Sequence, residues 1–263
     1  MPAQYAHDRF GALTARQLTG DLKEIVRKYY PQFRIGLQGP DIFFFYRAYK
    51  DNRVVRYGNH LHHVSALPFF RHARKVAAKY GRDSHQYAYL LGFICHYILD
   101  SECHPYVAEM MEKTGVAHLE IEGEFEKFLL YMDGKNAVSY PLARLIPTDD
   151  DTVEAIRPFY NDIHPKIVKR SLKDMKLVRR VFRAPCPVKQ WFLNTAMKIV
   201  GKYDTYKGLM LQRKDNHKCD EAVSGLFDRL VNAVPVAARM IASFDESLQT
   251  GKDLDERFDR TFE

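Results

Sequence analysis

The sequence predicts an all-α fold, and three observations support this prediction. Apolar residues recur at helical spacing in most long segments, as Leu22, Ile25 and Val26 do in DLKEIVRKYY. Alternating runs typical of β-strands are scarce. Proline, glycine and polar clusters separate the periodic segments, at 29–31, 37–41, 80–84, 132–136 and 183–187. We therefore expect roughly eight to ten helices.

The predicted helices follow one another along the chain. After the first amphipathic segment, LPFFRHARKVAAKY and HLEIEGEFEKFLL each place their apolar residues on one face. The later segments WFLNTAMKIVGKY and AVSGLFDRLVNAVPVAARMIASF also read as helices. Pro235 interrupts the last of these, so we expect a kink or a break there. The final TGKDLDERFDRTFE is polar and predicts a closing turn or a loose tail.

Length and composition favour a single all-helical domain over 1–263. The chain has 263 residues, of which 46% are hydrophobic and 13% aromatic, enough for one large core or two small ones. The stretch from Tyr140 to Asp151 holds two prolines and an acidic cluster, and it is either a seam or only a loop. We expect residues 1–130 to carry the functional site and 152–263 to be helical and basic.

Positive charge is concentrated in one part of the chain. The net charge is +7, and 166–214 holds fourteen Lys or Arg against two acids, Asp174 and Asp204. A run of this kind is more often a solvated helical face. The alternative is contact with an anionic partner, such as phosphate, a lipid surface or nucleic acid.

The sequence favours a soluble, cytoplasmic protein. The first thirty residues carry charges throughout and show no apolar segment typical of a secretory signal. No later window approaches the roughly 18 unbroken apolar residues that a transmembrane helix needs. The four cysteines are sparse and widely spaced, which indicates free thiols in a reducing compartment.

The segment YLLGFICHYILDSECHPYV places three ionisable residues in an apolar run. His96, Asp100 and His104 follow at four-residue steps, which on a helix are about 40° apart around the axis. An unpaired charge among apolar neighbours would cost several kcal/mol, of the order of 3–5. A divalent metal would compensate the charges, whereas the alternative for one His–Asp pair is a buried hydrogen bond. Pro105 predicts that the helix ends near His104.

A second pair repeats this pattern nearby. His118 and Glu122 stand four residues apart at the start of the next apolar-periodic segment, whereas Glu120 and Glu124 project from other faces. Mixed imidazole and carboxylate ligands suit Zn²⁺. Eight of the eleven histidines lie between His60 and His118. The two pairs together therefore predict a metal centre.

Further candidates lie upstream. In GPDIFFFY, Asp41 follows a Gly-Pro turn and precedes an aromatic run, so it is either a metal ligand or a helix N-cap. The residues 43–46 form a substrate wall or, as we favour, part of the core. The segment YGNHLHH offers His60, His62 and His63 as alternative ligands.

At this point the sequence resembles a known family, the bacterial zinc-dependent phospholipases C, whose all-helical fold is shared with single-strand-specific zinc nucleases. The resemblance rests on YAHDRFG, GPDIFFFY, YGNHLHH, YLLGFICHYILDSECHPYV and HLEIEGEF. It covers about the first half of the chain, to near Leu130, and beyond that point the chain matches only in being helical.

The resemblance implies two or three zinc ions. One ion would take Asp41, a histidine of HLHH, His96 and Asp100, and a second would take His104, His118 and Glu122. Within HLHH, the resemblance favours His62, because its position relative to Gly58 fits the family pattern best. A third ion, held in the secreted enzymes by the processed amino terminus, would here take His7, Asp100 and the amine of Pro2. The chain departs from those enzymes in beginning Met-Pro.

The resemblance also implies the reaction, hydrolysis of a phosphoric ester by metal-activated water with Asp41 as ligand and general base. The substrate would be a phospholipid-like ester or a nucleotide. One alternative is an intracellular nuclease or nucleotidase on the same scaffold. The other is a non-catalytic protein that zinc holds together, and Fe or Mn is a chemical alternative at some sites.

Overall fold

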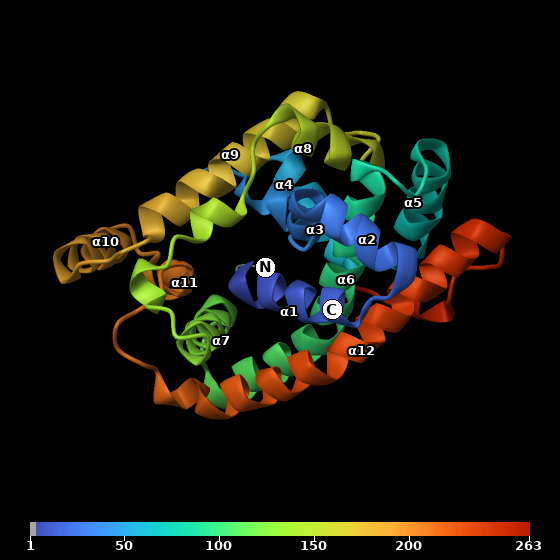
Figure 1. Cartoon of the computed structure of the whole chain (residues 1–263). Helices are drawn as coiled ribbons and strands as arrows, with labels where there is room; N and C mark the ends of the chain where they lie inside the picture. Colours follow the sequence, from blue (N-terminus) through green and yellow to red (C-terminus); the bar gives the residue numbers. More distant parts are fainter. Residues whose placement is uncertain (1–3) are drawn as a thin grey trace.

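The computed structural model describes residues 4–263, and its regular structure there is entirely helical. The predicted all-α class is therefore confirmed. The helices α1 to α12 of this part exceed the expected eight to ten, because short segments such as α3, α8 and α11 span two turns or less and show no periodicity (Figure 1). The α-helices are α1 Gln4–Gln17, α2 Gly20–Lys28, α3 Tyr30–Gly36, α4 Arg53–His63, α5 Leu67–Tyr80, α6 His85–Thr114, α7 His118–Met132, α8 Asp150–Ile156, α9 Pro165–Phe182, α10 Pro187–Ile199, α11 Tyr203–Tyr206 and α12 Asp220–Thr250.

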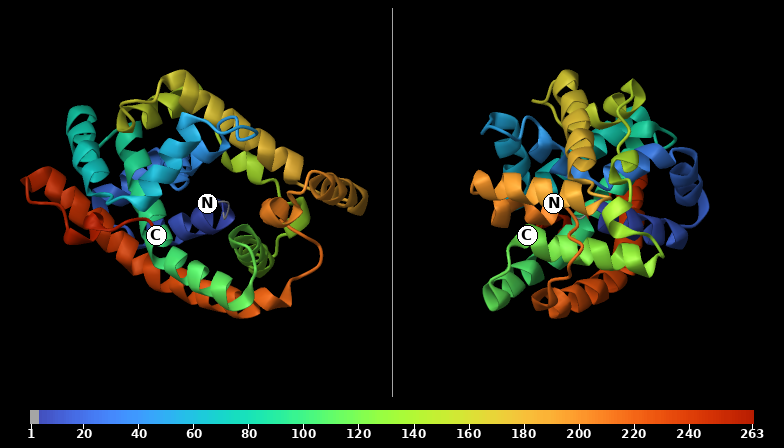
Figure 2. Two further views of the ribbon diagram at one scale, coloured as in Figure 1. Left: turned by 180° about the vertical axis from the view of Figure 1, so that it is seen from behind. Right: turned by 90° about the vertical axis from the view of Figure 1, so that its left-hand side faces the viewer.

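Short 3₁₀ helices connect several of these elements, and they are η1 Gly39–Phe45, η2 Ala137–Ser139, η3 Leu142–Leu145, η4 Arg157–Phe159, η5 Lys207–Leu209, η6 His217–Cys219 and η7 Glu256–Asp259. Figures 1 and 2 show α9 and α12 on opposite sides of the molecule, with α6 passing between the other helices. Among the described helices, none is long and apolar enough to cross a membrane.

Helix α6 is the centre of the fold. It begins where the Ser84 side chain accepts a hydrogen bond from the Tyr87 N–H, and it ends at Gly115, which has a left-handed conformation with a φ of 68°. Its residues 87–100 are all buried. A helix that is apolar around its whole circumference must be covered on every side, and α1, α3, α5 and α12 supply this cover.

The helix end expected near His104 is wrong, and of the kink or break expected at Pro235 the break is wrong. Helix α6 continues through Pro105 to Thr114, and α12 continues through Pro235 to Thr250. A proline removes the hydrogen bond to the carbonyl four residues earlier. Both prolines lie on the solvent side of their helices, and so do the residues four positions before them, Ser101 and Val231, which are partly or fully exposed. Water can therefore solvate the released carbonyl groups.

Two glycines allow α3 to approach α6 closely. A Cβ atom on Gly36 would lie 2.1 Å from the Tyr89 carbonyl oxygen, and one on Gly92 would lie 2.0 Å from the Phe33 carbonyl oxygen. These are backbone atoms, so no side-chain rotation relieves the clash. The close approach fixes the chain that leads from α3 into η1.

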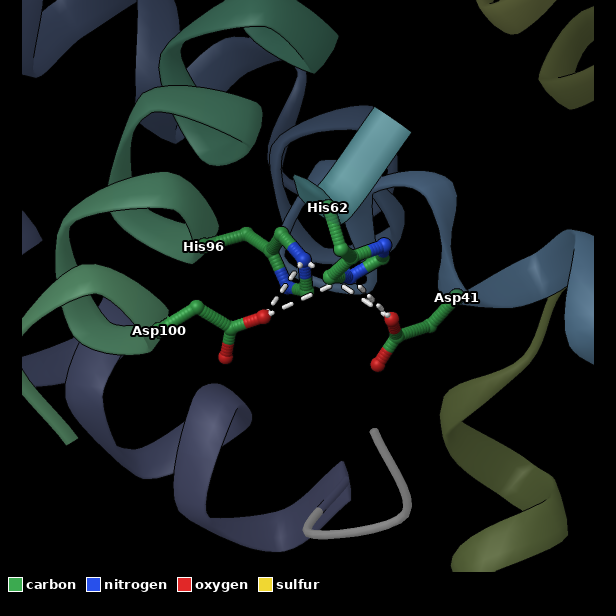
Figure 3. Close-up of side chains that lie close together, drawn as sticks. All are labelled: Asp41, His62, His96 and Asp100. Carbon is green, nitrogen blue, oxygen red and sulfur yellow. Dashed lines mark ion pairs between the residues drawn. The ribbon is translucent and has the colours of Figure 1, made fainter. Parts of the chain in front are cut away.

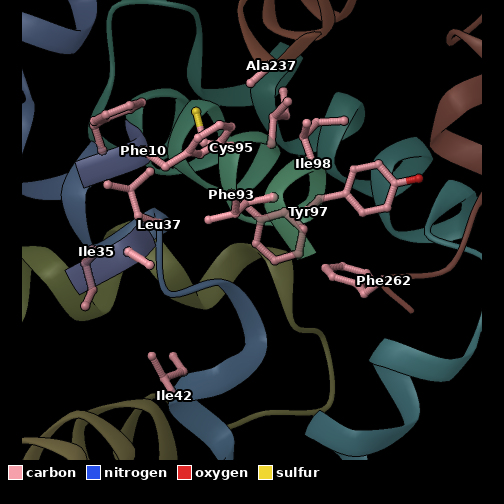
Figure 4. Packing of buried hydrophobic residues seen from close by; sticks show 14 of the residues in the cluster. Phe10, Ile35, Leu37, Ile42, Phe93, Cys95, Tyr97, Ile98, Ala237 and Phe262 are labelled. Carbon is pink, nitrogen blue, oxygen red and sulfur yellow. The ribbon is translucent and has the colours of Figure 1, made fainter. Parts of the chain in front are cut away.

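One large apolar cluster fills the interior (Figure 4). In it Phe93 and Tyr97 of α6 meet Phe10 and Leu37 from the first part of the chain and Phe262 from its end. A second, small cluster consists of Ala184, Met197 and Met210 with their partly buried neighbours. The large cluster draws on residues from both sides of the 140–151 stretch. The division of the chain into domains stays a prediction.

The four cysteines are free, as expected from the sequence; Cys95, Cys103 and Cys219 are buried and Cys186 is exposed.

We expect Gly36→Ala to lower the free energy of unfolding by about 2 kcal/mol or more, because the added methyl group forces α3 away from α6. Denaturant unfolding followed by circular dichroism measures this change. The matched control is Gly225→Ala, another glycine within a helix, where the new Cβ meets atoms of the Tyr106 side chain and not backbone atoms. A Gly36→Ala protein as stable as the control would contradict the close packing.

Candidate metal centre

Four side chains from three elements meet in the core. Asp41 comes from η1, His62 from the last turn of α4, and His96 and Asp100 from successive turns of α6. One nitrogen or oxygen atom of each lies within 4.8 Å of the others, and all four residues are buried (Figure 3). We call this set the first group.

The imidazoles of the first group direct Nε2 toward the two carboxylates. The His62 Nε2 atom lies 3.1 Å from Asp41 Oδ1 and 3.6 Å from Asp100 Oδ2. The His96 Nε2 atom lies 3.3 Å from Asp100 Oδ2 and 3.9 Å from Asp41 Oδ1. The atoms that surround the centre of this group are therefore two imidazole nitrogens and two carboxylate oxygens.

Backbone carbonyls hold the other side of each ring. The His62 Nδ1 atom lies 2.9 Å from the Gly58 oxygen, and the His96 Nδ1 atom lies 3.2 Å from the Leu37 oxygen. A carbonyl can only accept, so Nδ1 must carry the hydrogen. In the neutral imidazole this leaves the Nε2 lone pair for a metal, which is the arrangement that orients histidine ligands in metalloproteins.

The structure distinguishes among the three candidate histidines of HLHH. Only His62 is buried and joins the first group. His60 is exposed, and the exposed His63 pairs instead through Nδ1 with the Glu263 carboxylate at 2.9 Å. The α4 helix places residue 62 on its inner face because Gly58 and Val54, one and two turns earlier, are buried on the same face.

A second group lies beyond Asp100. It consists of His104 from α6 with His118 and Glu122 from α7, again with one ligand atom of each within 4.8 Å of the others. His118 Nε2 lies 3.1 Å from Glu122 Oε1. Both ring nitrogens of the buried His104 lack a hydrogen bond to any described residue. A buried polar atom without a partner is costly, and a bound cation would satisfy it.

Asp100 lies between the two groups. Its Oδ2 atom faces His62 and His96, whereas its Oδ1 atom lies 3.2 Å from His7 Nε2 and 3.7 Å from His104 Nε2. The His7 ring, from α1, stacks on the His96 ring with centroids 4.6 Å apart. The structure therefore brings His7 to Asp100. Pro2, the other expected contributor to a third site, lies outside the described residues.

Burial and charge set the protonation of these groups. Burial lowers the pKa of His96 to about 3, so its imidazole is neutral. Burial also raises the pKa of Asp100, but His96 and His104 more than offset this and hold the pKa well below its ordinary value. Burial lowers the pKa of His62, yet its hydrogen bonds to Asp100 and Asp41 raise it to about 9. Ionised carboxylates beside imidazoles form a donor set that suits a divalent cation.

Asp41 is not a helix N-cap. It lies inside η1, where its backbone N–H donates to the Gln38 carbonyl at 3.0 Å, and its side chain is fully buried. Gly39 precedes it with a φ of 47°, and a Cβ there would lie 2.1 Å from the His96 ring. The Gly-Pro pair therefore lets the chain pass directly over His96 before it presents Asp41.

The aromatic run after Asp41 belongs mainly to the core, as favoured from the sequence. Phe43 is fully buried, with its ring edge-on to Tyr160 at a centroid distance of 4.8 Å, and Phe45 is buried as well. Phe44 is half-buried and faces His62, with ring centroids 5.1 Å apart. One residue of the run thus borders the first group.

Sequence reasoning missed three neighbours of the centre. Glu126 is buried, and its carboxylate accepts the N–H of Tyr5 at the start of α1. Its Oε2 atom lies 4.0 Å from a guanidinium nitrogen of the buried Arg179 of α9. The centroids of the Phe262 and His62 rings lie 5.1 Å apart, and the backbone N–H of Phe262 donates to the His62 carbonyl at 3.2 Å. Glu126 stands four residues after Glu122 on the same face, a signal that was available. No local pattern points to Arg179 or Phe262.

Comparison with known proteins agrees with this geometry. A family model described as zinc dependent phospholipase C matches residues 6–173, which is more than half of the chain and extends past the Leu130 limit expected from the sequence. The matched segment contains every residue of both groups and His7. No curated protein and no solved structure matches. The chain therefore belongs to the zinc-dependent phospholipase C family, a family of metal-dependent phosphodiesterases.

Proposed function

We propose that this protein hydrolyses a phospholipid-like phosphoric diester at a centre of two or three zinc ions. The observation that carries the proposal is the meeting of imidazole and carboxylate groups from α1, η1, α4, α6 and α7 in one buried place. Folding buries charged groups in this way only where something compensates them. Family membership supplies the reaction class.

In this proposal the two groups hold one ion each. Asp41, His62, His96 and Asp100 would bind the first, and His104, His118 and Glu122 the second. Asp100 has one oxygen directed to each side, so it would bridge the two ions, and His7 with Asp100 would contribute to a third. The mixture of nitrogen and oxygen donors favours Zn²⁺, with Fe or Mn as alternatives at some positions.

Zinc bound here would neutralise charge on the phosphoryl group and lower the pKa of a water molecule toward about 7. The chain's own residues would do the rest. Burial raises the pKa of Asp41, but electrostatic interactions with neighbouring groups such as His96 and the hydrogen bond from His62 hold it well below its ordinary value, so the carboxylate is ionised. We assign Asp41 as ligand and as acceptor of the proton from the attacking water.

Two other functions are weighed against this one. A nuclease or nucleotidase on the same scaffold is favoured by the basic 166–214 segment, which would attract an anionic polymer. A non-catalytic protein held together by zinc would show closed ligand shells and no turnover. A cytoplasmic location, expected from the sequence, stays a prediction.

We predict that His118→Ala lowers the zinc content by about one ion per chain, because it removes one of three ligands of the second group. Elemental analysis of the purified protein, with circular dichroism to verify the helical fold, measures this. The control is His60→Ala, since His60 is exposed and belongs to neither group. Unchanged zinc content in His118→Ala would remove the second site from the proposal.

We predict that Asp41→Asn lowers kcat on a chromogenic phosphodiester by about 10²–10⁴-fold, because an amide cannot accept the proton. The matched control is Asp51→Asn, an exposed carboxylate that pairs with Arg56 on the surface. Zinc content is measured in parallel, which separates loss of the base from loss of a ligand. Full activity in Asp41→Asn would disprove its assigned role.

The substrate class is tested by two parallel assays of the zinc-loaded protein. Release of diacylglycerol from phosphatidylcholine supports the proposal, whereas degradation of single-stranded DNA without lipid cleavage supports the nuclease alternative. Removal of zinc by a chelator should abolish the activity and destabilise the fold, because an ion that binds only the native state stabilises it. Full zinc occupancy with no turnover in either assay would favour the structural alternative.

A further inference from the structure

Helix α10 presents its apolar side chains to solvent. Val188, Trp191, Phe192 and Ile199 follow at helical spacing along one face, and their side chains are 74%, 67%, 63% and 81% exposed. Single exposed apolar residues are ordinary on a protein surface. A contiguous stripe with two large aromatic rings is not, and it marks a surface that contacts another body.

The opposite face of α10 combines amides with apolar side chains. Gln190 is buried and donates through Nε2 to Gln212 Oε1 at 2.6 Å, and Asn194 exchanges hydrogen bonds with the same Gln212 side chain. Met197 anchors the helix in the small second apolar cluster. Two amides, Gln190 and Asn194, therefore face the protein beside Leu193 and Met197, whereas the aromatic rings face outward.

The helix lies at the edge of the molecule. Figures 1 and 2 show α10 beyond the end of α9, where it projects past the other helices. Two further apolar residues near the carboxyl end of α9, Leu177 and Val181, are also exposed. We call the exposed apolar residues of α10 and these two residues of α9 the apolar edge.

Positive charge borders the apolar edge. Residues 175–203 contain seven Lys or Arg and no Asp or Glu. Arg180 of α9 is exposed, and so are Lys198 and Lys202 at the end of α10. Tryptophan and phenylalanine on one side with lysine around them are typical of helices that lie in the interface of a membrane.

We propose that the apolar edge docks on a lipid bilayer that carries anionic headgroups. The rings of Trp191 and Phe192 enter the boundary between headgroups and acyl chains, and the surrounding lysine and arginine residues contact the lipid phosphates. A second copy of this chain is the less suitable occupant. A two-fold contact through this edge would bring the cations of both copies together, and the core of protein interfaces is usually depleted of lysine.

Contacts connect the apolar edge to the metal centre on both sides of α10. Before it, α9 packs on η1, which carries Asp41, and the Arg179 guanidinium lies 6.0 Å from the centre of the Phe45 ring. After it, η5 packs on α7, which carries His118 and Glu122, and a Cβ on Gly123 would lie 2.8 Å from the Gly208 oxygen. A docked α10 would thus hold the centre at a fixed distance from the lipid. The inference that docking supplies the substrate rests on the proposed function. The docking itself is independent of that function.

Trp191 is the only tryptophan in the chain, so its fluorescence reports on α10 alone. The zinc-loaded protein is mixed with vesicles of phosphatidylcholine, with and without phosphatidylglycerol. We expect a blue shift of Trp191 emission, quenching by brominated acyl chains and co-flotation with the anionic vesicles. Raising the salt from roughly 0.1 to 0.5 M should weaken binding, since it screens the contacts to phosphate.

Three variants test the edge itself. Val188→Ser with Phe192→Ser keeps Trp191 as a reporter and should lower the partition coefficient into anionic vesicles by about tenfold or more. Lys198→Glu with Lys202→Glu should also lower the partition coefficient, and the decrease should be larger at low salt than at high salt. Tyr49→Ser with Val231→Ser removes two exposed apolar residues from other parts of the surface and should change nothing.

Three results would overturn the proposal. These are vesicle binding that Val188→Ser with Phe192→Ser leaves unchanged, absence of any shift or flotation, and a dimer in analytical ultracentrifugation whose Trp191 is already shielded without lipid. Hydrolysis of a soluble chromogenic phosphodiester is measured separately and should be unaffected by these serine substitutions. If the protein proves inactive on phosphodiesters, the vesicle results still decide the docking, so the two failures are distinguishable.

Discussion

The contacts of the Asp100 carboxylate are the interaction on which the rest of the structure depends. One oxygen faces His62 and His96, and the other faces His7 and His104, so a single side chain joins α1, α4 and two turns of α6. Such a group in an apolar interior is tolerated only where charge and hydrogen bonds compensate it. The long central helix, the close approach of α3 and the cover by α12 all serve to enclose this position while keeping its partners in reach.

Rigidity around the centre comes from the backbone. The Gly58 and Leu37 carbonyls fix the rings of His62 and His96, and the glycine at 39 lets the chain pass over His96. Glu126 accepts the N–H of Tyr5 in the first turn of α1 and thereby ties the helix of His7 to the helix of Glu122. Because these hydrogen bonds come from the chain's own backbone and side chains, they hold the donor atoms in position for binding, which lowers the entropy lost when a ligand is captured.

Two features of the surface differ from the interior: prolines within helices and apolar side chains exposed to solvent. Pro105 and Pro235 remain in unbroken helices, and each lies on a side of its helix that is open to water. On α10 Gln190 lies inside and the Trp191 ring lies outside, and the small apolar cluster around Met197, not the main core, supports the helix. A helix built this way gains little from burial against its own protein, so its exposed face is free for contact with another body.

The sequence alone determined the all-α class and the order of the candidate ligands His96, Asp100, His104, His118 and Glu122. Their spacing of four residues places each pair on one helix face through local geometry that no packing can alter. Tertiary structure decided which histidine of 60, 62 and 63 turns inward, that Asp41 lies within η1, and that Glu126, Arg179 and Phe262 border the centre. It also decided that the two prolines stay inside helices. These outcomes depend on contacts between segments far apart in the chain and on which side of a helix meets water, and neither is encoded by the spacing of neighbouring residues.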